Sequence, residues 1–118
     1  MDDLYYGEYI GLETILNSQH PRSFDRVEDG NDEMLFIIIH QAYELWFKQV
    51  IFELDRVRRI FMGGNINDNA GEMGAATGKL KRVVKILELV NQQVGVLETM
   101  NALDFLEFRN YLLPASGF

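Results

Sequence analysis

One segment of the 118-residue chain is apolar on almost every side of the helix that it predicts. Aromatic and aliphatic residues recur around the whole helical wheel between about residues 33 and 62: Leu35, Ile38, Ile39, Ala42, Leu45, Trp46, Phe47, Val50, Phe52 and Leu54. Charge is confined to a narrow stripe of Glu44, Lys48, Asp55 and Arg59, with pairs four residues apart. A helix that is apolar nearly all round has to be buried on nearly all sides. We therefore expect partner subunits, a further part of the polypeptide or a large apolar ligand to cover it.

Three other segments also have helical patterns. A short amphipathic run within residues 1–19 carries Tyr9, Leu12, Ile15 and Leu16, and His20–Pro21 ends it. A further helix from about Lys79 to Met100 is expected to pack antiparallel to the long one through a seam of Leu80, Val83, Leu87, Val90, Val94 and Leu97. Asp104 and Glu107 form a possible capping pair for a last short helix, which Pro114 ends. The predicted fold is all-α, a helical bundle around one long buried helix, and residues 1–118 are expected to form one domain.

The connections between these helices have turn chemistry. Residues 21–31 are expected to be a polar loop, and Asn31 or Asp32 the N-cap of the long helix. Gly63–Gly64 is expected to end that helix, and residues 65–78 to form a loop or a weak helix. The acidic pairs, Asp32–Glu33 among them, are expected to be solvated faces and caps.

Charge and composition exclude several functional classes. The net charge is −7, which disfavours binding to nucleic acid or to an anionic membrane surface. No stretch approaches the ~18 apolar residues of a membrane-spanning helix. The chain has no cysteine, so thiolate chemistry and disulfides are excluded. We expect a soluble protein of the cytoplasm.

Two histidines and one arginine are the main candidates for chemistry. His20 precedes a proline and is expected at the surface, whereas His40 lies in the apolar stretch IIIHQAYELW. His40 is either a core histidine bonded to a backbone carbonyl or a polar group that faces an apolar ligand pocket. Arg109 rises from the apolar stripe of the last helix, and either extends to solvent or holds a carboxylate. Neither residue belongs to a self-sufficient catalytic set.

Three long motifs carry a resemblance to a known family. The run DEMLFIIIHQAYELWFKQVIFELDRVRRIF, the opening YGEYIGLETILNSQ and the closing LETMNALDFLEFRNYLLPASGF follow one another in the order found in the tryptophan 2,3-dioxygenases. The resemblance covers nearly the whole chain and is weakest between Gly63 and Lys79. It implies a larger helical fold that binds haem b and inserts both atoms of O2 across the indole C2–C3 bond of L-tryptophan, giving N-formylkynurenine for the kynurenine pathway.

The resemblance also implies roles for individual residues. His40 resembles the distal histidine that hydrogen-bonds the indole N–H, and Phe36 the aromatic wall of the same pocket. Arg109 resembles the arginine that pairs with the substrate carboxylate, beside Phe105, where some relatives have tyrosine. Three further matches are Ser116, which resembles a serine beside the haem, and Tyr6 and Tyr9, which resemble tyrosines that reach the adjacent subunit of a homotetramer.

The length departs from the family pattern. Family members are more than twice as long, and the histidine that ligates the iron lies in the part that is absent here, so no metal ligand is expected in this chain. We expect the N-terminal portion of an enzyme, without turnover on its own. A related dioxygenase for another indole and a non-catalytic helical remnant that self-associates stay open as alternatives.

Overall fold

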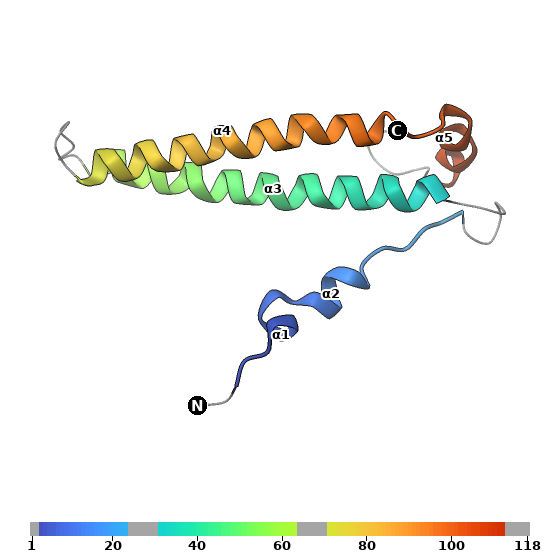
Figure 1. The fold of residues 1–118 in the computed structure, drawn as a ribbon, viewed down its shortest axis with the longest axis horizontal. Coiled ribbons are helices and arrows are strands. Elements are labelled where there is room, and N and C mark those ends of the chain that lie inside the picture. Colours follow the sequence, from blue (N-terminus) through green and yellow to red (C-terminus); the bar gives the residue numbers. More distant parts are fainter. Residues whose placement is uncertain (1–2, 24–30, 64–70, 113–118) are drawn as a thin grey trace. The chain divides into compact units, whose positions relative to one another are not determined.

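The computed structural model describes residues 3–23, 31–63 and 71–112, and these residues form helices and no strand (Figure 1). The predicted all-α class is confirmed. The chain divides into two compact units, one of Met1–Ile38 with Asn101–Phe118 and one of Ile39–Met100. None of the described helices is long and apolar enough to cross a membrane.

The longest element is α3, Asn31–Met62, which confirms the helix predicted over residues 33–62. It ends at Gly63, whose N–H lies 3.2 Å from the carbonyl oxygens of both Arg59 and Ile60. The prediction that Asn31 or Asp32 is the N-cap is wrong, because both residues already lie in the first helical turn.

The next helix, α4, is Gly71–Leu97 and starts eight residues before the predicted Lys79. Of the two forms expected for residues 65–78, the described part from residue 71 is helical. Alanine and methionine favour a helix here, and Ala76 is buried with 1% of its surface exposed. Residues 64–70 lie outside the described residues.

Within the unit of residues 39–100, α3 and α4 pack side by side (Figure 1). Val50 of α3 meets Val83 and Ile86 of α4, with Trp46 and Val90 packed against them. The less exposed residues of α4 and the turn that follows it recur every three or four positions: Met73, Ala76, Lys79, Val83, Ile86, Val90, Gln93, Leu97 and Met100. The two helices therefore pack against each other as predicted, but partly through other residues of α4 than the predicted ones.

Three residues that the sequence predicts to lie in the seam lie outside it. Leu80, Leu87 and Val94 are 41%, 46% and 41% exposed. The residues directly before them (Lys79, Ile86 and Gln93) occupy the seam instead. A sequence pattern cannot separate two adjacent apolar stripes when a lysine and a glutamine bury their aliphatic stems in the seam.

The amphipathic run near the N-terminus forms two short helices rather than one. α1 is Tyr6–Ile10 and α2 is Leu12–Leu16, and Gly11 between them has a φ of 66°. A left-handed residue breaks the helical ladder, and glycine adopts this conformation without a steric penalty. No residue of either helix is buried.

The last helix, α5, is Ala102–Arg109, followed by a 3-10 turn at Asn110–Leu112. Asn101 caps it, since the Asn101 side-chain oxygen accepts a 2.9 Å hydrogen bond from the Leu103 N–H. The prediction of an Asp104–Glu107 capping pair is wrong, because Asp104 already lies inside the first turn. Pro114 lies outside the described residues.

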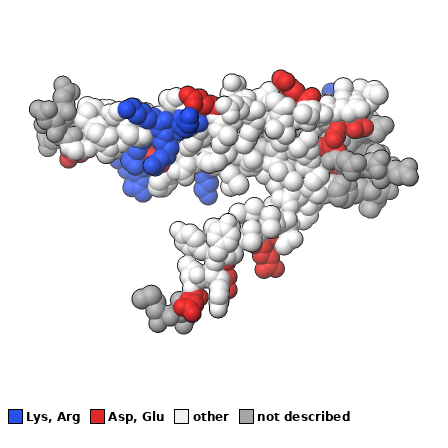
Figure 2. Space-filling model, in the orientation of Figure 1, with Lys and Arg blue, Asp and Glu red and all other residues white. Residues whose placement is uncertain are grey.

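Large apolar side chains remain exposed on both long helices, and the space-filling view shows broad uncharged areas over them (Figure 2). On α3 these residues include Leu45, Ile51, Phe52, Leu54 and Phe61, and on α4 Leu80, Val84, Leu87, Leu89, Val94 and Val96. Within the unit of residues 39–100, these side chains of α3 lie outside the side that packs on α4.

Candidate functional site

Three phenylalanines form a compact cluster in the unit that contains the start of α3 and α5. The Phe36 ring centroid lies 5.9 Å from that of Phe105 and 5.5 Å from that of Phe108, which is 5.4 Å from Phe105. Two of the three contacts are edge-on, the favoured arrangement for aromatic rings. The structure therefore brings together the predicted residues Phe36 and Phe105. Phe108, only 3% exposed, is the member that the sequence analysis missed, although its i,i+3 spacing from Phe105 was a signal.

Arg109 directly follows this cluster. It is the last residue of α5, so its cation lies at the negative end of the helix dipole. Its side chain is exposed. Among the residues whose side chains the structure describes, none forms an ion pair with it. The exposed guanidinium can take a carboxylate in a bidentate pair.

His40 belongs to the other unit and lies on α3. It is exposed in the described part of the chain and so lies outside the core that these residues form. Its ring lies edge-on to Tyr43 at 6.4 Å, and Tyr43 stacks on Phe47 at 6.1 Å. The Tyr43 hydroxyl is buried and has no hydrogen-bond partner among the described residues. The His40 imidazole thus lies at the edge of the aromatic stack of Tyr43 and Phe47.

The remaining predicted site residues are either exposed or outside the described residues. Tyr6 and Tyr9, 73% and 75% exposed, lie on α1, and no contact described in this chain explains why both are there. His20 is exposed beyond α2, as predicted. Ser116 lies outside the described residues, so its predicted place beside a cofactor stays a prediction.

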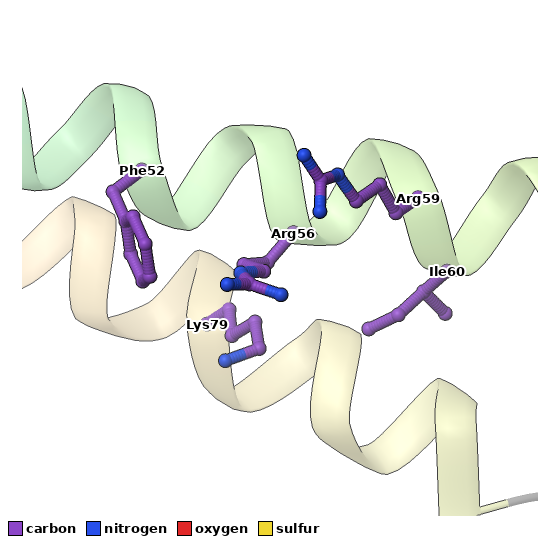
Figure 3. A pocket seen from close by; sticks show the side chains of 5 residues that line it. All are labelled: Phe52, Arg56, Arg59, Ile60 and Lys79. Carbon is purple, nitrogen blue, oxygen red and sulfur yellow. The ribbon is translucent and has the colours of Figure 1, made fainter.

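A basic groove lies at the other end of the α3–α4 pair (Figures 2 and 3). It has a volume of about 530 Å³ and is lined by Phe52, Arg56, Arg59, Ile60 and Lys79. Each cation already has a partner: Arg56 lies 4.9 Å over the Phe52 ring, Arg59 Nε is 3.0 Å from Asp55, and Lys79 Nζ is 3.6 Å from Glu53. Two of these interactions lie within α3, and the Lys79–Glu53 pair joins α4 to α3.

Two carboxylates define the charge network around this groove. A hydrogen bond from Arg58 holds the pKa of Asp55 below its ordinary value, with help from Arg59. The pKa of Glu53 is also lowered, chiefly by the hydrogen bond from Arg82, although burial opposes the shift. The sequence analysis placed Asp55 and Arg59 correctly in one stripe but missed Glu53.

Glu33 was also misjudged. The prediction that the acidic pairs are solvated faces and caps is wrong for Glu33, which is fully buried and accepts hydrogen bonds from the backbone and side chain of Ser23. A buried carboxylate needs such donors, and three are present.

Each unit by itself carries groups of the kind that line a haem pocket. No group of three His, Cys, Asp or Glu side chains among the described residues is arranged to hold a metal ion. The unit of residues 39–100 has the exposed imidazole of His40 on an aromatic helix face. The other unit has a phenylalanine cluster that is followed by the exposed cation of Arg109. Aromatic walls and an imidazole suit a large flat apolar group that brings its own metal.

Comparison with known proteins gives a consistent result. A family model described as tryptophan 2,3-dioxygenase matches residues 1–118. Tryptophan 2,3-dioxygenase of Bdellovibrio bacteriovorus is 52% identical over 115 residues, which are 98% of this chain and 32% of that protein. The Rattus norvegicus protein of the same name is 54% identical over 115 residues, which are 98% of this chain and 28% of that protein. The chain thus spans about a third of the length of these relatives.

Proposed function

The chain belongs to the tryptophan 2,3-dioxygenase family, and we propose on this premise that it is the N-terminal part of a haem-dependent enzyme that oxidises L-tryptophan to N-formylkynurenine. The observation that carries the proposal is the family match over all 118 residues. The fold supports it, because the two positions expected to bind the indole and the carboxylate are both exposed.

His40 is proposed to accept the indole N–H. A polar N–H that is moved from water into an apolar pocket loses a hydrogen bond, and an imidazole nitrogen replaces it. Tyr43 supports the ring from one edge, so that the imidazole can orient the substrate. Haem supplies the activation of O2 when it is bound, and the chain positions and desolvates the substrate.

Arg109 is proposed to hold the substrate carboxylate, and Phe36 and Phe105 to form apolar wall beside it. Phe105 offers no hydroxyl, so Arg109 binds the carboxylate without help from that position. Ser116 is proposed to lie beside the haem, and Tyr6 and Tyr9 to close the site of a neighbouring subunit.

The exposed apolar surfaces of α3 and α4 support a larger assembly. Monomeric proteins rarely leave so many large apolar side chains in water. We propose that other parts of the enzyme and further subunits of a cytoplasmic homo-oligomer, a tetramer, cover these helix faces.

The test is product formation by the complete enzyme assembled with this chain. With haem, O2 and L-tryptophan, we expect N-formylkynurenine to form, and a parallel assay with indole and other indole derivatives measures the strictness for tryptophan. Haem uptake without N-formylkynurenine from L-tryptophan would refute the proposed reaction. Turnover of another indole alone would favour the related-dioxygenase alternative.

A further inference from the structure

The first turn of α3 contacts two other segments, one that precedes it in sequence and one that follows much later. All of these residues lie within one compact unit. Glu33 accepts hydrogen bonds of 2.9 Å from the Arg22 N–H, 2.7 Å from the Ser23 N–H and 2.7 Å from the Ser23 hydroxyl. Glu33 and Ser23 are both 0% exposed. Breaking such a contact would leave a buried charge without donors, so this turn is a fixed point of the unit.

The neighbouring carboxylate faces the other segment. Asp32 Oδ2 accepts a 3.0 Å hydrogen bond from the Asn101 N–H, across 69 residues of sequence. Asn101 is also the cap of α5, through its side-chain bond to the Leu103 N–H. Asp32 therefore holds the residue from which α5 starts.

One turn further along α3, Phe36 packs against Phe105 and Phe108 of α5. Asp32 and Phe36 are four residues apart and so share one helix face. Together they fix α5 at two points, at its cap and at its middle. Arg109 is the last residue of this eight-residue helix, so its place follows from these two contacts.

We propose that Asp32 is a positioning residue for Arg109: it holds the cap of α5 and so sets where the guanidinium meets the substrate carboxylate. Glu33, bound to Ser23, anchors the turn from which Asp32 acts. The role of Arg109 in substrate binding rests on the proposed function, whereas the control of α5 by Asp32 does not.

The first arm of the test measures amide exchange in the complete protein assembled with this chain, without substrate. Asp32→Ala removes the acceptor of the Asn101 N–H, and we expect amide hydrogen exchange at Asn101 to be about tenfold faster. Asp32→Asn keeps an acceptor oxygen and should retain most of the protection. Glu72→Ala, which removes an exposed first-turn carboxylate from α4, is the matched control and should leave Asn101 unchanged. Unchanged exchange in Asp32→Ala would overturn the proposal.

The second arm uses the complete enzyme assembled with this chain. We expect Asp32→Ala to raise the KM for L-tryptophan about tenfold with a smaller change in kcat, and Asp32→Asn to restore it. Tryptamine lacks the carboxylate, so its inhibition constant should not change. An equal loss for both ligands, or a fall in kcat alone, would contradict the positioning role. If the wild type forms no N-formylkynurenine, the proposed function fails, and the exchange experiment still decides whether Asp32 holds α5.

Discussion

Arg82 of α4 donates a 2.9 Å hydrogen bond to Oε1 of Glu53 of α3, and this carboxylate is only 2% exposed. Gln49 donates a second bond of 3.0 Å to the same oxygen, and Lys79 Nζ lies 3.6 Å from the other. Moving this nearly buried carboxylate away from the two cations of α4 would leave its charge uncompensated. Glu53 therefore favours the observed alignment of α3 and α4.

The lowered pKa of Glu53 predicts how stability depends on pH. A carboxylate whose pKa is depressed on folding stabilises the fold above its unfolded value, here the ordinary 4.5, and this contribution is lost as pH falls through the folded value. We expect Glu53→Gln to unfold at lower urea concentration than the wild type at pH 7. Below pH 4.5 the difference between the two proteins should shrink. A difference that is constant or grows toward acid would contradict the ion pair.

The face of α4 that packs on α3 predicts losses of stability of different size at two adjacent residues. Ile86 is 8% exposed in the core, and Leu87 is 46% exposed. We expect Ile86→Ala to lower the free energy of unfolding by at least about 2 kcal/mol, through lost burial and a cavity. Leu87→Ala should cost less than about 1 kcal/mol. Urea unfolding of both variants measures this, and a larger loss at Leu87 would restore the register expected from the sequence.

Helices α3 and α4 show how much of the fold can be predicted from the sequence. Continuous apolar character identified α3 nearly to the residue, because a run of about 30 residues without Gly or Pro, ended by Gly63–Gly64, is far longer than a strand. It did not identify the face of α4 that meets α3, since Leu80, Leu87 and Val94 are as apolar as the true seam. That choice depends on the pairing of Lys79 and Arg82 with Glu53, which is a contact between residues distant in sequence and not a local pattern.

The candidate site was predictable in a similar, partial way. The motifs identified Phe36, Phe105 and Arg109, and the structure places the two phenylalanines in contact. The carboxylates of Asp32 and Glu33 were expected to act on their own helix only. Their true acceptor roles depend on Ser23 and Asn101, which the sequence does not place near them.

The break between α1 and α2 gives a third prediction. Gly11 has a φ of 66° and nothing within 4 Å of an added Cβ, so backbone strain is the only cost of a side chain there. Gly11→Ala should destabilise the two-helix segment by about 1 kcal/mol or more. Gly7→Ala, within α1 and with an ordinary φ, should instead stabilise it slightly. Amide exchange of residues 6–16 in both variants distinguishes these effects.

Arg109 gives a prediction for the complete enzyme assembled with this chain. Arg109→Met removes a charged, bidentate partner of the substrate carboxylate, and we expect the KM for L-tryptophan to rise about 10- to 100-fold. Arg109→Lys should recover only part of this, since an ammonium cannot form the same two bonds. Steady-state kinetics measures both, with Arg58→Met, an exposed arginine of α3, as the control. An unchanged KM in Arg109→Met would remove Arg109 from the site.

The central claim is that this chain contributes the residue that orients the indole ring. The measurement that tests it most directly compares wild type and His40→Ala in the complete, haem-loaded enzyme, for both the rate of N-formylkynurenine formation and the amount of haem retained. The account predicts that turnover of L-tryptophan falls far more than haem content, by 10-fold or more, because only the hydrogen bond to the indole N–H is lost. An equal loss of turnover and haem, or full turnover without the imidazole, would contradict it.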